Sequence, residues 1–356
     1  MMKIATIAYL HGAGGAERQI CMLTNALADL ENEVHLIILA ENEIKYKISD
    51  NVMIHDLSSS SKCGFYGIVK RFVALKKVMK KIQPDISIHF WFQSAYFCAF
   101  MDKKYSGKIV YAERGDPSDK EYNGLLGMIR KTTIKRIDGF VFQSEAAKNY
   151  FDHKVREKSI VIHNPVSVPE NLYCDPCMHR NKKIVNVGRL YPQKNQKLLV
   201  EAFAQVHKKL PDYIMEIYGD GLLEDELRQE IFQLSLDKKV FLYPSRKDIF
   251  TVMYESSLFV LSSDYEGMLN VLMEAMALGV PCLTTDYNPG SVKEIIDDGI
   301  NGYIVPPGNA EVLAKKMIDI LQDDNHQELC RRAQQIRSNH SQKHIYLKWE
   351  KFLKEL

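Results

Sequence analysis

Apolar and polar positions in the first half of the chain form an alternating series of short strand-like and longer helix-like segments. Runs such as KIATIAYL and EVHLIILA have the length of buried strands, whereas GGAERQICMLTNALADL carries apolar residues at helical spacing. Apolar strands separated by helices predict a parallel sheet that is covered on both faces. Further strands are expected in ISIHFWF, KIVYAE, GFVFQS and SIVIHNPV, and a second helix in FYGIVKRFVALKKVMKKIQPD.

The same alternation restarts with KIVNVGRL after a segment, residues 165–182, that holds three prolines and no periodicity. Such a segment predicts a domain boundary. We therefore expect an α/β protein with two doubly wound, Rossmann-like domains, residues 1–166 and 167–339, facing each other across a cleft at the carboxyl ends of their strands. The last segment, about residues 340–356, is expected to be a helix that packs back onto the first domain.

The composition is that of a soluble globular protein, with 46% hydrophobic and 26% charged residues among 356. No apolar run reaches the roughly 18 residues of a membrane-spanning helix, and the first residues favour a strand over a signal peptide. The seven cysteines are scattered, which fits a reducing cytoplasm. Zinc binding by Cys174 and Cys177 is disfavoured because no second pair follows.

Charge is distributed unevenly between the two halves. Residues 1–166 contain 24 Lys and Arg against 18 Asp and Glu, whereas the remainder contains 23 against 27. The first half is therefore basic and the second mildly acidic, which bears on partners rather than on fold.

The stretch SSDYEGMLNVLMEAMALGVPC, residues 262–282, places two carboxylates around the start of a helix. Apolar residues at helical spacing predict a helix from about Asn270 to Leu278 that contains Glu274, and Glu266 lies just upstream. A helix N-terminus offers unpaired N–H groups to an anion, so the pair suits a ligand with both phosphate and hydroxyl groups. The alternative is an acid favoured by the helix dipole together with an incidental surface Glu.

These carboxylates combine with several other short motifs. The motifs are VGRL with Arg189, Lys194 five residues later, GDG at 219–221, GGAER at 14–18 and HNPV at 163–166. Together they resemble the retaining glycosyltransferases of family 4, over nearly the whole chain. The sequence around the two carboxylates is similar to that of bacterial enzymes that add N-acetylhexosamine, often N-acetylgalactosamine, to capsule, O-antigen or other glycans. The resemblance implies the GT-B fold.

The resemblance also implies roles for individual residues at a donor site. Arg189 and Lys194 would hold the pyrophosphate of a UDP-sugar, and Glu266 would meet the sugar hydroxyls. Independently of the resemblance, two cations after a strand end can neutralise a leaving diphosphate, although a plain surface pair is the alternative. No metal is implied. Of the remaining donor contacts, Glu274 would bind the ribose, and the backbone of Gly267, Met268 and Leu269 would receive the phosphates. The GDG loop with Gly219 would also contact the donor. The base would lie near Ser245 and Arg246.

The loop HGAGGAER after the first strand lacks the GxGxxG order of a dinucleotide fingerprint. The resemblance implies that Gly14 and Gly15 let the backbone approach the donor phosphate. A plain tight turn is the alternative.

The acceptor side departs from the family pattern. Family members commonly carry a His after the strand that corresponds here to IVYAERGDP, where this chain has Glu113, Arg114 and Asp116. Arg114 could bind an acceptor phosphate, and Asp116 or Glu113 could orient the incoming hydroxyl. Each could equally form a salt bridge within the loop.

One predicted helix, residues 68–82, combines an apolar stripe with a basic remainder. It fits either an ordinary amphipathic helix or a basic face on an anionic membrane. The basic first domain favours the membrane, whereas the absence of an aromatic-basic platform argues against nucleic acid. The stripe is Ile68, Phe72, Leu75, Met79 and Ile82, and the cations are Lys70, Arg71, Lys76, Lys77, Lys80 and Lys81.

These observations predict a cytoplasmic glycosyltransferase, peripheral on the inner face of the cell membrane. It would move a sugar, an N-acetylhexosamine, from a UDP-sugar to a lipid-linked (polyprenyl diphosphate) saccharide with retention of configuration. A UDP-sugar epimerase of the same fold and a non-catalytic sugar-nucleotide-binding assembly protein remain alternatives.

Overall fold

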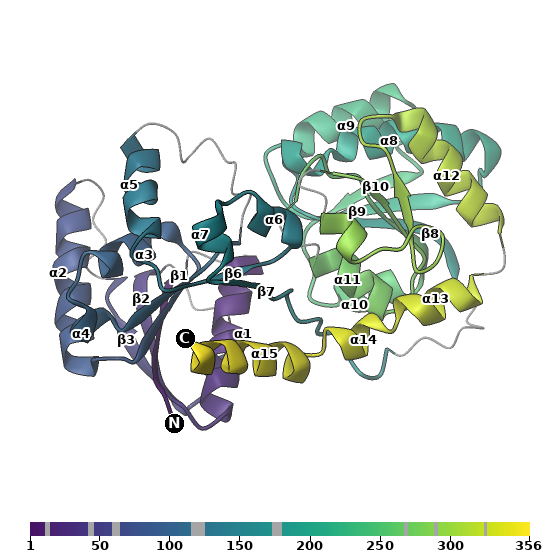
Figure 1. Cartoon of the computed structure of the whole chain (residues 1–356). Helices are drawn as coiled ribbons and strands as arrows, with labels where there is room; N and C mark the ends of the chain where they lie inside the picture. The colour runs from purple at the N-terminus through teal and green to yellow at the C-terminus, as the bar shows by residue number, and fades with distance from the viewer. Residues whose placement is uncertain are drawn as a thin grey trace. The chain divides into compact units, whose positions relative to one another are not determined.

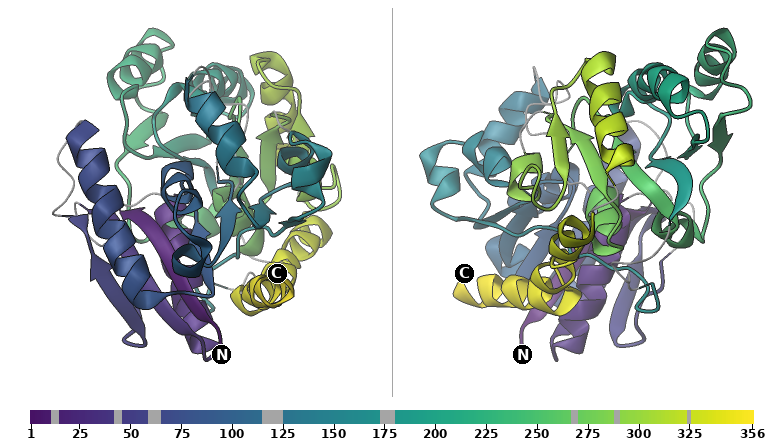
Figure 2. Two further views of the ribbon diagram at one scale, coloured as in Figure 1. Left: turned by 60° about the vertical axis from the view of Figure 1, so that its left-hand side comes forward. Right: turned by 90° about the vertical axis from the view of Figure 1, so that its right-hand side faces the viewer.

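The computed structural model describes residues 1–10, 15–41, 46–58, 65–114, 125–172, 180–266, 270–287, 291–323 and 326–356. These residues form two compact units, Met1–Asn164 with Lys343–Leu356, and Pro165–Gln342 (Figure 1). Each unit contains one parallel sheet with helices on both faces (Figure 2). The predicted α/β class is therefore confirmed.

The first unit holds a seven-stranded sheet in the order β3-β2-β1-β4-β5-β6-β7, with every pair parallel. Strand order reverses between β1 and β4, which is the usual place for ligands in a doubly wound sheet. Its strands are β1 (Lys3–Leu10), β2 (Glu33–Glu41), β3 (Val52–Asp56), β4 (Ile86–His89), β5 (Lys108–Ala112), β6 (Gly139–Phe142) and β7 (Ser159–Val161). Its helices are α1 (Gly15–Asp29), α2 (Phe65–Ile82), α3 (Phe92–Ala99), α4 (Lys103–Ser106), α5 (Leu125–Ile134), α6 (Glu145–Asn149), α7 (His153–Arg156) and α15 (Gln342–Glu355).

Continuous apolar strands are explained by two separate cores, one on each face of the sheet. In β1, Ile4 and Ala8 belong to the core under α1 and α15, whereas Ala5 and Ile7 belong to the core under α2 and α3. Successive side chains of a strand point to opposite faces, so a strand buried on both sides needs apolar residues at nearly every position.

Helix α15 completes the first core although it is the last helix of the chain (Figures 1 and 2). Ile345, Tyr346, Trp349 and Leu353 lie on one helical face and are buried in the core that includes α1 residues. The Trp349 ring stacks on Phe90 with centroids 6.3 Å apart.

The second unit holds a six-stranded parallel sheet in the order β10-β9-β8-β11-β12-β13. In β11, Leu258 and Val260 face the core under α8, α9 and α12, whereas Phe259 and Leu261 face the core under α10 and α11. Its strands are β8 (Asn181–Val187), β9 (Ile214–Tyr218), β10 (Val240–Tyr243), β11 (Ser256–Leu261), β12 (Cys282–Thr285) and β13 (Tyr303–Val305). Its helices are α8 (Gln196–Lys209), α9 (Glu224–Gln233), α10 (Ile249–Tyr254), α11 (Asn270–Ala277), α12 (Ala310–Gln322), α13 (Gln327–Ala333) and α14 (Ile336–Asn339), with 3-10 turns η3 (Pro192–Lys194) and η4 (Ser291–Glu294).

Some elements differ from the sequence expectation. The segment ISIHFWF was expected to be one strand, but β4 ends at His89 and α3 begins at Phe92. Periodicity cannot separate a buried strand from a buried helix in so short an apolar run. Strand β3 had no expected counterpart, because it lies at the sheet edge and exposes most of its residues.

Replacing Trp349 by Ala should destabilise the first unit by about 3–5 kcal/mol, because it empties a fully buried aromatic site. Urea unfolding followed by circular dichroism measures this. Lys351→Ala, at an exposed position of the same helix, is the control and should change stability by less than about 0.5 kcal/mol. Equal effects of the two substitutions would show that α15 is not part of the core.

Candidate active site

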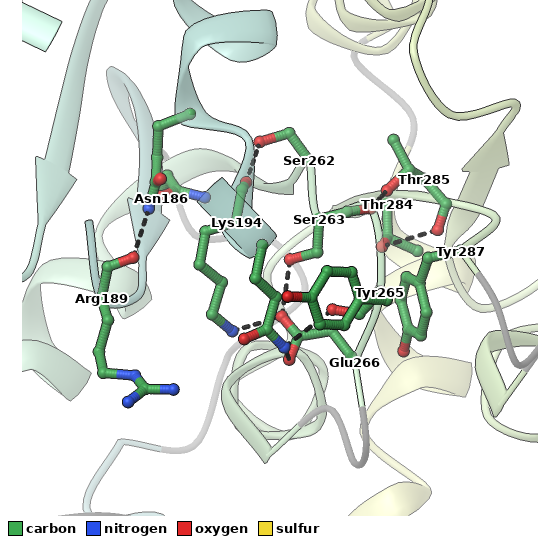
Figure 3. Close-up of polar contacts among 12 residues, drawn as sticks. Asn186, Arg189, Lys194, Ser262, Ser263, Tyr265, Glu266, Thr284, Thr285 and Tyr287 are labelled. Atoms are coloured by element: carbon green, nitrogen blue, oxygen red, sulfur yellow. Dashed lines mark hydrogen bonds and ion pairs between the residues drawn. The ribbon is translucent and has the colours of Figure 1, made fainter. Parts of the chain in front are cut away.

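The loops that follow β8 and β11 lie at the same edge of the second sheet, because these strands are parallel neighbours. After β8 the chain passes through η3 into α8, and after β11 it reaches Glu266, shortly before α11 begins. Figure 3 shows the polar side chains that these two loops bring together.

The centre of this arrangement is an ion pair between the Lys194 ammonium and Glu266 Oε1. Glu266 is only 7% exposed. It also accepts a hydrogen bond from Ser263 Oγ to Oε1 (2.6 Å) and one from Gln193 Nε2 to Oε2 (3.3 Å). A buried carboxylate is tolerated when it is both paired and hydrogen-bonded, and here both conditions hold.

Further hydrogen bonds fix the two loops to each other. Ser262 Oγ donates to the Lys194 carbonyl (3.0 Å), and Asn195 Nδ2 donates to Asp264 Oδ1 (2.8 Å). Thr285 Oγ1, from the end of β12, donates to the Ser263 carbonyl (2.5 Å). The positions of Lys194 and Glu266 are therefore set by several contacts besides their own.

Arg189 lies in the same loop as Lys194 but in a different setting. Its side chain is exposed and its guanidinium contacts the Tyr191 ring at 5.1 Å. In Figure 3 it lies apart from Glu266, and no contact is drawn between the two residues. No carboxylate in the described part of the chain forms an ion pair with Arg189, so its charge is available to an anion.

The GDG motif has a steric explanation. Gly188 N–H donates to the Tyr218 carbonyl (2.9 Å), and Leu190 N–H donates to the Asp220 carbonyl (3.0 Å), so the loops after β8 and β9 run against each other. A Cβ on Gly219, whose φ is +155°, would lie 2.0 Å from the Gly188 carbonyl oxygen. Only glycine permits this approach.

Glu274 lies in α11, as the helical periodicity predicted, and is 7% exposed. Its role toward a ribose stays a prediction. Gly15 is the first residue of α1. The remaining loop positions lie outside the described residues; they are Gly14, Asp116, Cys174, Cys177 and the residues expected to bind phosphate, Gly267, Met268 and Leu269.

Ser245 and Arg246, the expected base contacts, have protein partners. Ser245 Oγ donates a hydrogen bond to Asp220 Oδ2 (2.6 Å). Hydrogen bonding from Ser245 lowers the pKa of the Asp220 carboxyl. Arg246 Nε donates to Asp248 Oδ1 (2.7 Å), a contact that raises the pKa of Arg246. Binding of a base here would have to share or replace these contacts.

On the first unit, Glu113 is 3% exposed and fully engaged. It accepts hydrogen bonds from the Tyr111 hydroxyl (3.1 Å) and from Arg130 (3.1 Å). This geometry favours the salt-bridge alternative over the orientation of an incoming hydroxyl.

Arg114 is similarly held by its neighbours. Its guanidinium stacks 4.1 Å from the Phe90 ring centroid and 5.7 Å from that of Trp349, and it donates to Asn164 Oδ1 (2.7 Å). Burial lowers the pKa of Arg114 to about 9, so the side chain is still a cation at neutral pH. These contacts favour packing, and the predicted acceptor role remains untested.

The structure also reveals residues that sequence reasoning did not single out. Ser263, Gln193 and Thr285 complete the surroundings of Glu266. Ser263 precedes Glu266 by three positions in SSDYE, but a serine there has no distinctive pattern. Tyr287 is nearby and buried, which raises its pKa well above the ordinary value.

Two family models match the chain. One, described as Glycosyltransferase Family 4, matches residues 13–169, and the other, described as Glycosyl transferases group 1, matches residues 178–337. Both halves of the chain are therefore matched.

Two relatives of known name come from Campylobacter jejuni. The chain is 27% identical over 363 positions, covering 100% of this chain and 99% of the relative, to GalNAc-alpha-(1->4)-GalNAc-alpha-(1->3)-diNAcBac-PP-undecaprenol alpha-1,4-N-acetyl-D-galactosaminyltransferase. It is 28% identical over 344 positions, 91% of each chain, to N-acetylgalactosamine-N,N'-diacetylbacillosaminyl-diphospho-undecaprenol 4-alpha-N-acetylgalactosaminyltransferase.

Among solved structures, Anabaena HepE in complex with UDP superposes with a TM-score of 0.83, covering 100% of both chains at 21% identity. At this identity the likeness concerns the fold, and it confirms the GT-B fold expected from the sequence.

Gly219→Ala should distort the crossing of the β8 and β9 loops, because the added methyl would overlap the Gly188 carbonyl. We expect a loss of about 1–3 kcal/mol and faster amide exchange at Leu190 and Leu223, measured by urea unfolding and hydrogen exchange. The control is Gly308→Ala, whose φ is +73° but whose Cβ would meet no atom within 4 Å. It should leave exchange at both amides unchanged; protection that survives in Gly219→Ala would refute the steric explanation.

Arg114→Lys retains the charge but cannot stack on Phe90 and bond Asn164 in the same way. If packing is the role of Arg114, the free energy of unfolding falls by about 1–3 kcal/mol, since the hydrogen bond to Asn164 Oδ1 and the stacking on Phe90 are weakened, while activity per folded molecule is kept. Urea unfolding and initial rates decide this. Normal stability with lost activity would instead support the acceptor-side role.

Proposed function

This chain belongs to glycosyltransferase family 4, and we propose that it transfers an N-acetylhexosamine from a UDP-sugar to a lipid-linked saccharide with retention of configuration. The observation that carries the proposal is the ion pair between the largely buried Lys194 and Glu266, in the same loop region as the exposed Arg189. Two cations that suit a diphosphate therefore lie near a carboxylate that suits hydroxyl groups, which supports the proposal. The names of the two Campylobacter relatives, N-acetylgalactosaminyltransferases with undecaprenyl-diphosphate acceptors, support the choice of sugar and acceptor.

The leaving group of the reaction is a nucleoside diphosphate, on which negative charge grows as the sugar departs. Lys194 and Arg189 would stabilise this charge, and such preorganised charges contribute most in the transition state. Glu266 holds the Lys194 ammonium in place, whereas the Arg189 side chain is exposed and contacts only the Tyr191 ring among the interactions of the described residues. The backbone of residues 267–269 and the start of α11 would receive the phosphates. These groups can carry the diphosphate without a metal ion.

The two carboxylates would serve different hydroxyl groups. Glu266 would accept hydrogen bonds from the sugar, and Glu274 from the ribose. Both are buried in the second unit, so both belong to the donor side of the proposal.

Retention by double displacement would need a carboxylate nucleophile close to the anomeric carbon. Glu266 is a poor nucleophile because Lys194, Ser263 and Gln193 already donate to its two oxygens. We therefore propose a front-face reaction, in which the incoming hydroxyl and the leaving phosphate lie on the same side of an oxocarbenium-like sugar.

A lipid-linked acceptor requires the enzyme to reach a membrane surface. Helix α2 offers exposed apolar side chains at Ile68 (44%), Val69 (44%) and Val73 (59%) beside exposed Lys70 and Lys77. Ile68 belongs to the predicted apolar stripe and is exposed, and Val69 and Val73 outside that stripe add to the exposed apolar surface. We propose that α2 docks on the anionic cytoplasmic face of the membrane.

No helix in the described ranges has the length and apolar character needed to cross a bilayer.

Lys194→Ala and Arg189→Ala should each lower turnover by about 10²-fold or more, because each removes a charge that stabilises the transition state. Initial rates with a UDP-sugar and a lipid-linked acceptor measure this. Lys197→Ala, an exposed lysine of α8 near both residues in sequence, is the control and should retain the wild-type rate. Wild-type turnover in both donor-site variants would place the diphosphate elsewhere.

Replacing Lys70, Lys77 and Lys81 of α2 by Gln should weaken binding to anionic liposomes by about 3 kcal/mol at most, at about 1 kcal/mol per cation. Co-sedimentation at low and high salt measures it, since such attraction is screened within about 8 Å at physiological salt.

The matched control for this variant removes three exposed lysines of the second unit, Lys208, Lys209 and Lys238. If both triple variants sediment like the wild type, α2 is a solvated helix rather than a docking surface.

A further inference from the structure

A cavity of about 430 Å³ opens at the amino-terminal edge of the first sheet. We call it the edge pocket. Ile109 at the start of β5, Asp138 just before β6 and Lys158 just before β7 line it. Glu113 and Arg114 follow the opposite, carboxyl-terminal end of β5. The edge pocket is therefore separate from the residues so far assigned to donor or acceptor, and its volume is typical of small-molecule sites.

The lining of the edge pocket carries an excess of positive charge. Among the described residues that line it, four cations, Lys103, Lys135, Arg136 and Lys158, stand against one carboxylate, Asp138. The remaining lining residues are mostly apolar.

The one carboxylate of the lining is already engaged. Asp138 Oδ1 accepts from the Lys103 ammonium, and Oδ2 accepts from the Ile109 N–H at 2.9 Å. Two acids near the rim are engaged as well, since Asp102 caps α4 and Asp152 caps α7. None of these is placed to neutralise the other three cations by direct contact.

Those three cations contact neutral groups or solvent. Arg136 donates to the Ala99 carbonyl at 3.0 Å, and Lys158 donates to the Ile137 carbonyl. Lys135 is exposed and forms no ion pair within the described ranges. Burial lowers the pKa of Lys158, and the nearby Asp138 and Asp152 charges oppose this effect only in part.

We propose that the edge pocket binds a phosphate-bearing anion, with Lys135, Arg136 and Lys158 as its ligands. Phosphate oxygens accept several charge-assisted hydrogen bonds at once, and three cations that form no ion pair among the described residues match at least two negative charges. The apolar part of the lining suits an organic group attached to the phosphate. The phosphate can come from a free anion or from the headgroup of a phospholipid. This site does not depend on the proposed transferase reaction.

The test compares two charge-matched variants of the full chain. Lys135→Gln with Lys158→Gln removes two charges from the edge pocket. Lys154→Gln with Arg156→Gln removes two charges from α7 in the same unit, at exposed positions outside the pocket. Helix α2 and the donor site are intact in both.

The first arm is calorimetry with inorganic pyrophosphate in the presence of excess UDP, which occupies the donor site. The second arm is co-sedimentation with phosphatidylglycerol vesicles, with phosphatidylcholine vesicles as the neutral reference. We expect the pocket variant to lose at least tenfold in affinity in one arm while the α7 variant matches the wild type. Loss in the first arm identifies a free phosphate ligand, and loss confined to the second identifies a lipid headgroup.

The proposal is overturned if the pocket variant and the α7 variant behave alike in both arms. It is also overturned if the wild type binds neither pyrophosphate nor phosphatidylglycerol.

Discussion

The ion pair between Lys194 and Glu266 organises the proposed donor site of this enzyme. Two charges removed from water are unfavourable unless their geometry is good and their other hydrogen-bonding sites are filled. Here Ser263 and Gln193 donate hydrogen bonds to the Glu266 carboxylate, and Thr285 donates a hydrogen bond to the Ser263 carbonyl. The pair joins two loops whose residues are 72 positions apart in the chain. The pair also holds the Lys194 ammonium at the proposed diphosphate site, so this positive charge needs little reorganisation when the ligand binds.

The sheet explains why these loops can meet at all. Strands β8 and β11 are parallel neighbours, so the segments that follow them emerge at one edge. Backbone sterics then bring in the β9 loop, because Gly219 allows its chain to touch Gly188. On the first unit, the same rule places Glu113 and Arg114 at the carboxyl end of β5. There Phe90, Trp349 and Arg130 enclose them, and the position supports the packing of α15.

The fold could be predicted from the sequence because the same local pattern of apolar and polar residues repeats along the chain. Apolar strands buried on two faces and amphipathic helices recur in both halves, and the helix carrying Glu274 has clear stop signals at Gly279 and Pro281. Edge strand β3 and helix α3 could not be predicted, since one is largely exposed and the other continues an apolar run. The partners of Glu266 were also missed, because contacts between distant segments leave no periodic trace. Roles toward the donor came from the family resemblance, not from spacing.

The central claim is that the chain moves a sugar from a UDP-sugar to a lipid-linked acceptor with retention of configuration. The most direct measurement incubates the protein with isotope-labelled UDP-N-acetylhexosamine and a polyprenyl-diphosphate saccharide, and determines the anomeric configuration of the lipid product by NMR. The account predicts label in the lipid fraction, UDP released in equal amount, and the same anomeric configuration as in the donor. An inverted linkage, or label that remains in a nucleotide sugar or appears only as free sugar, would contradict it.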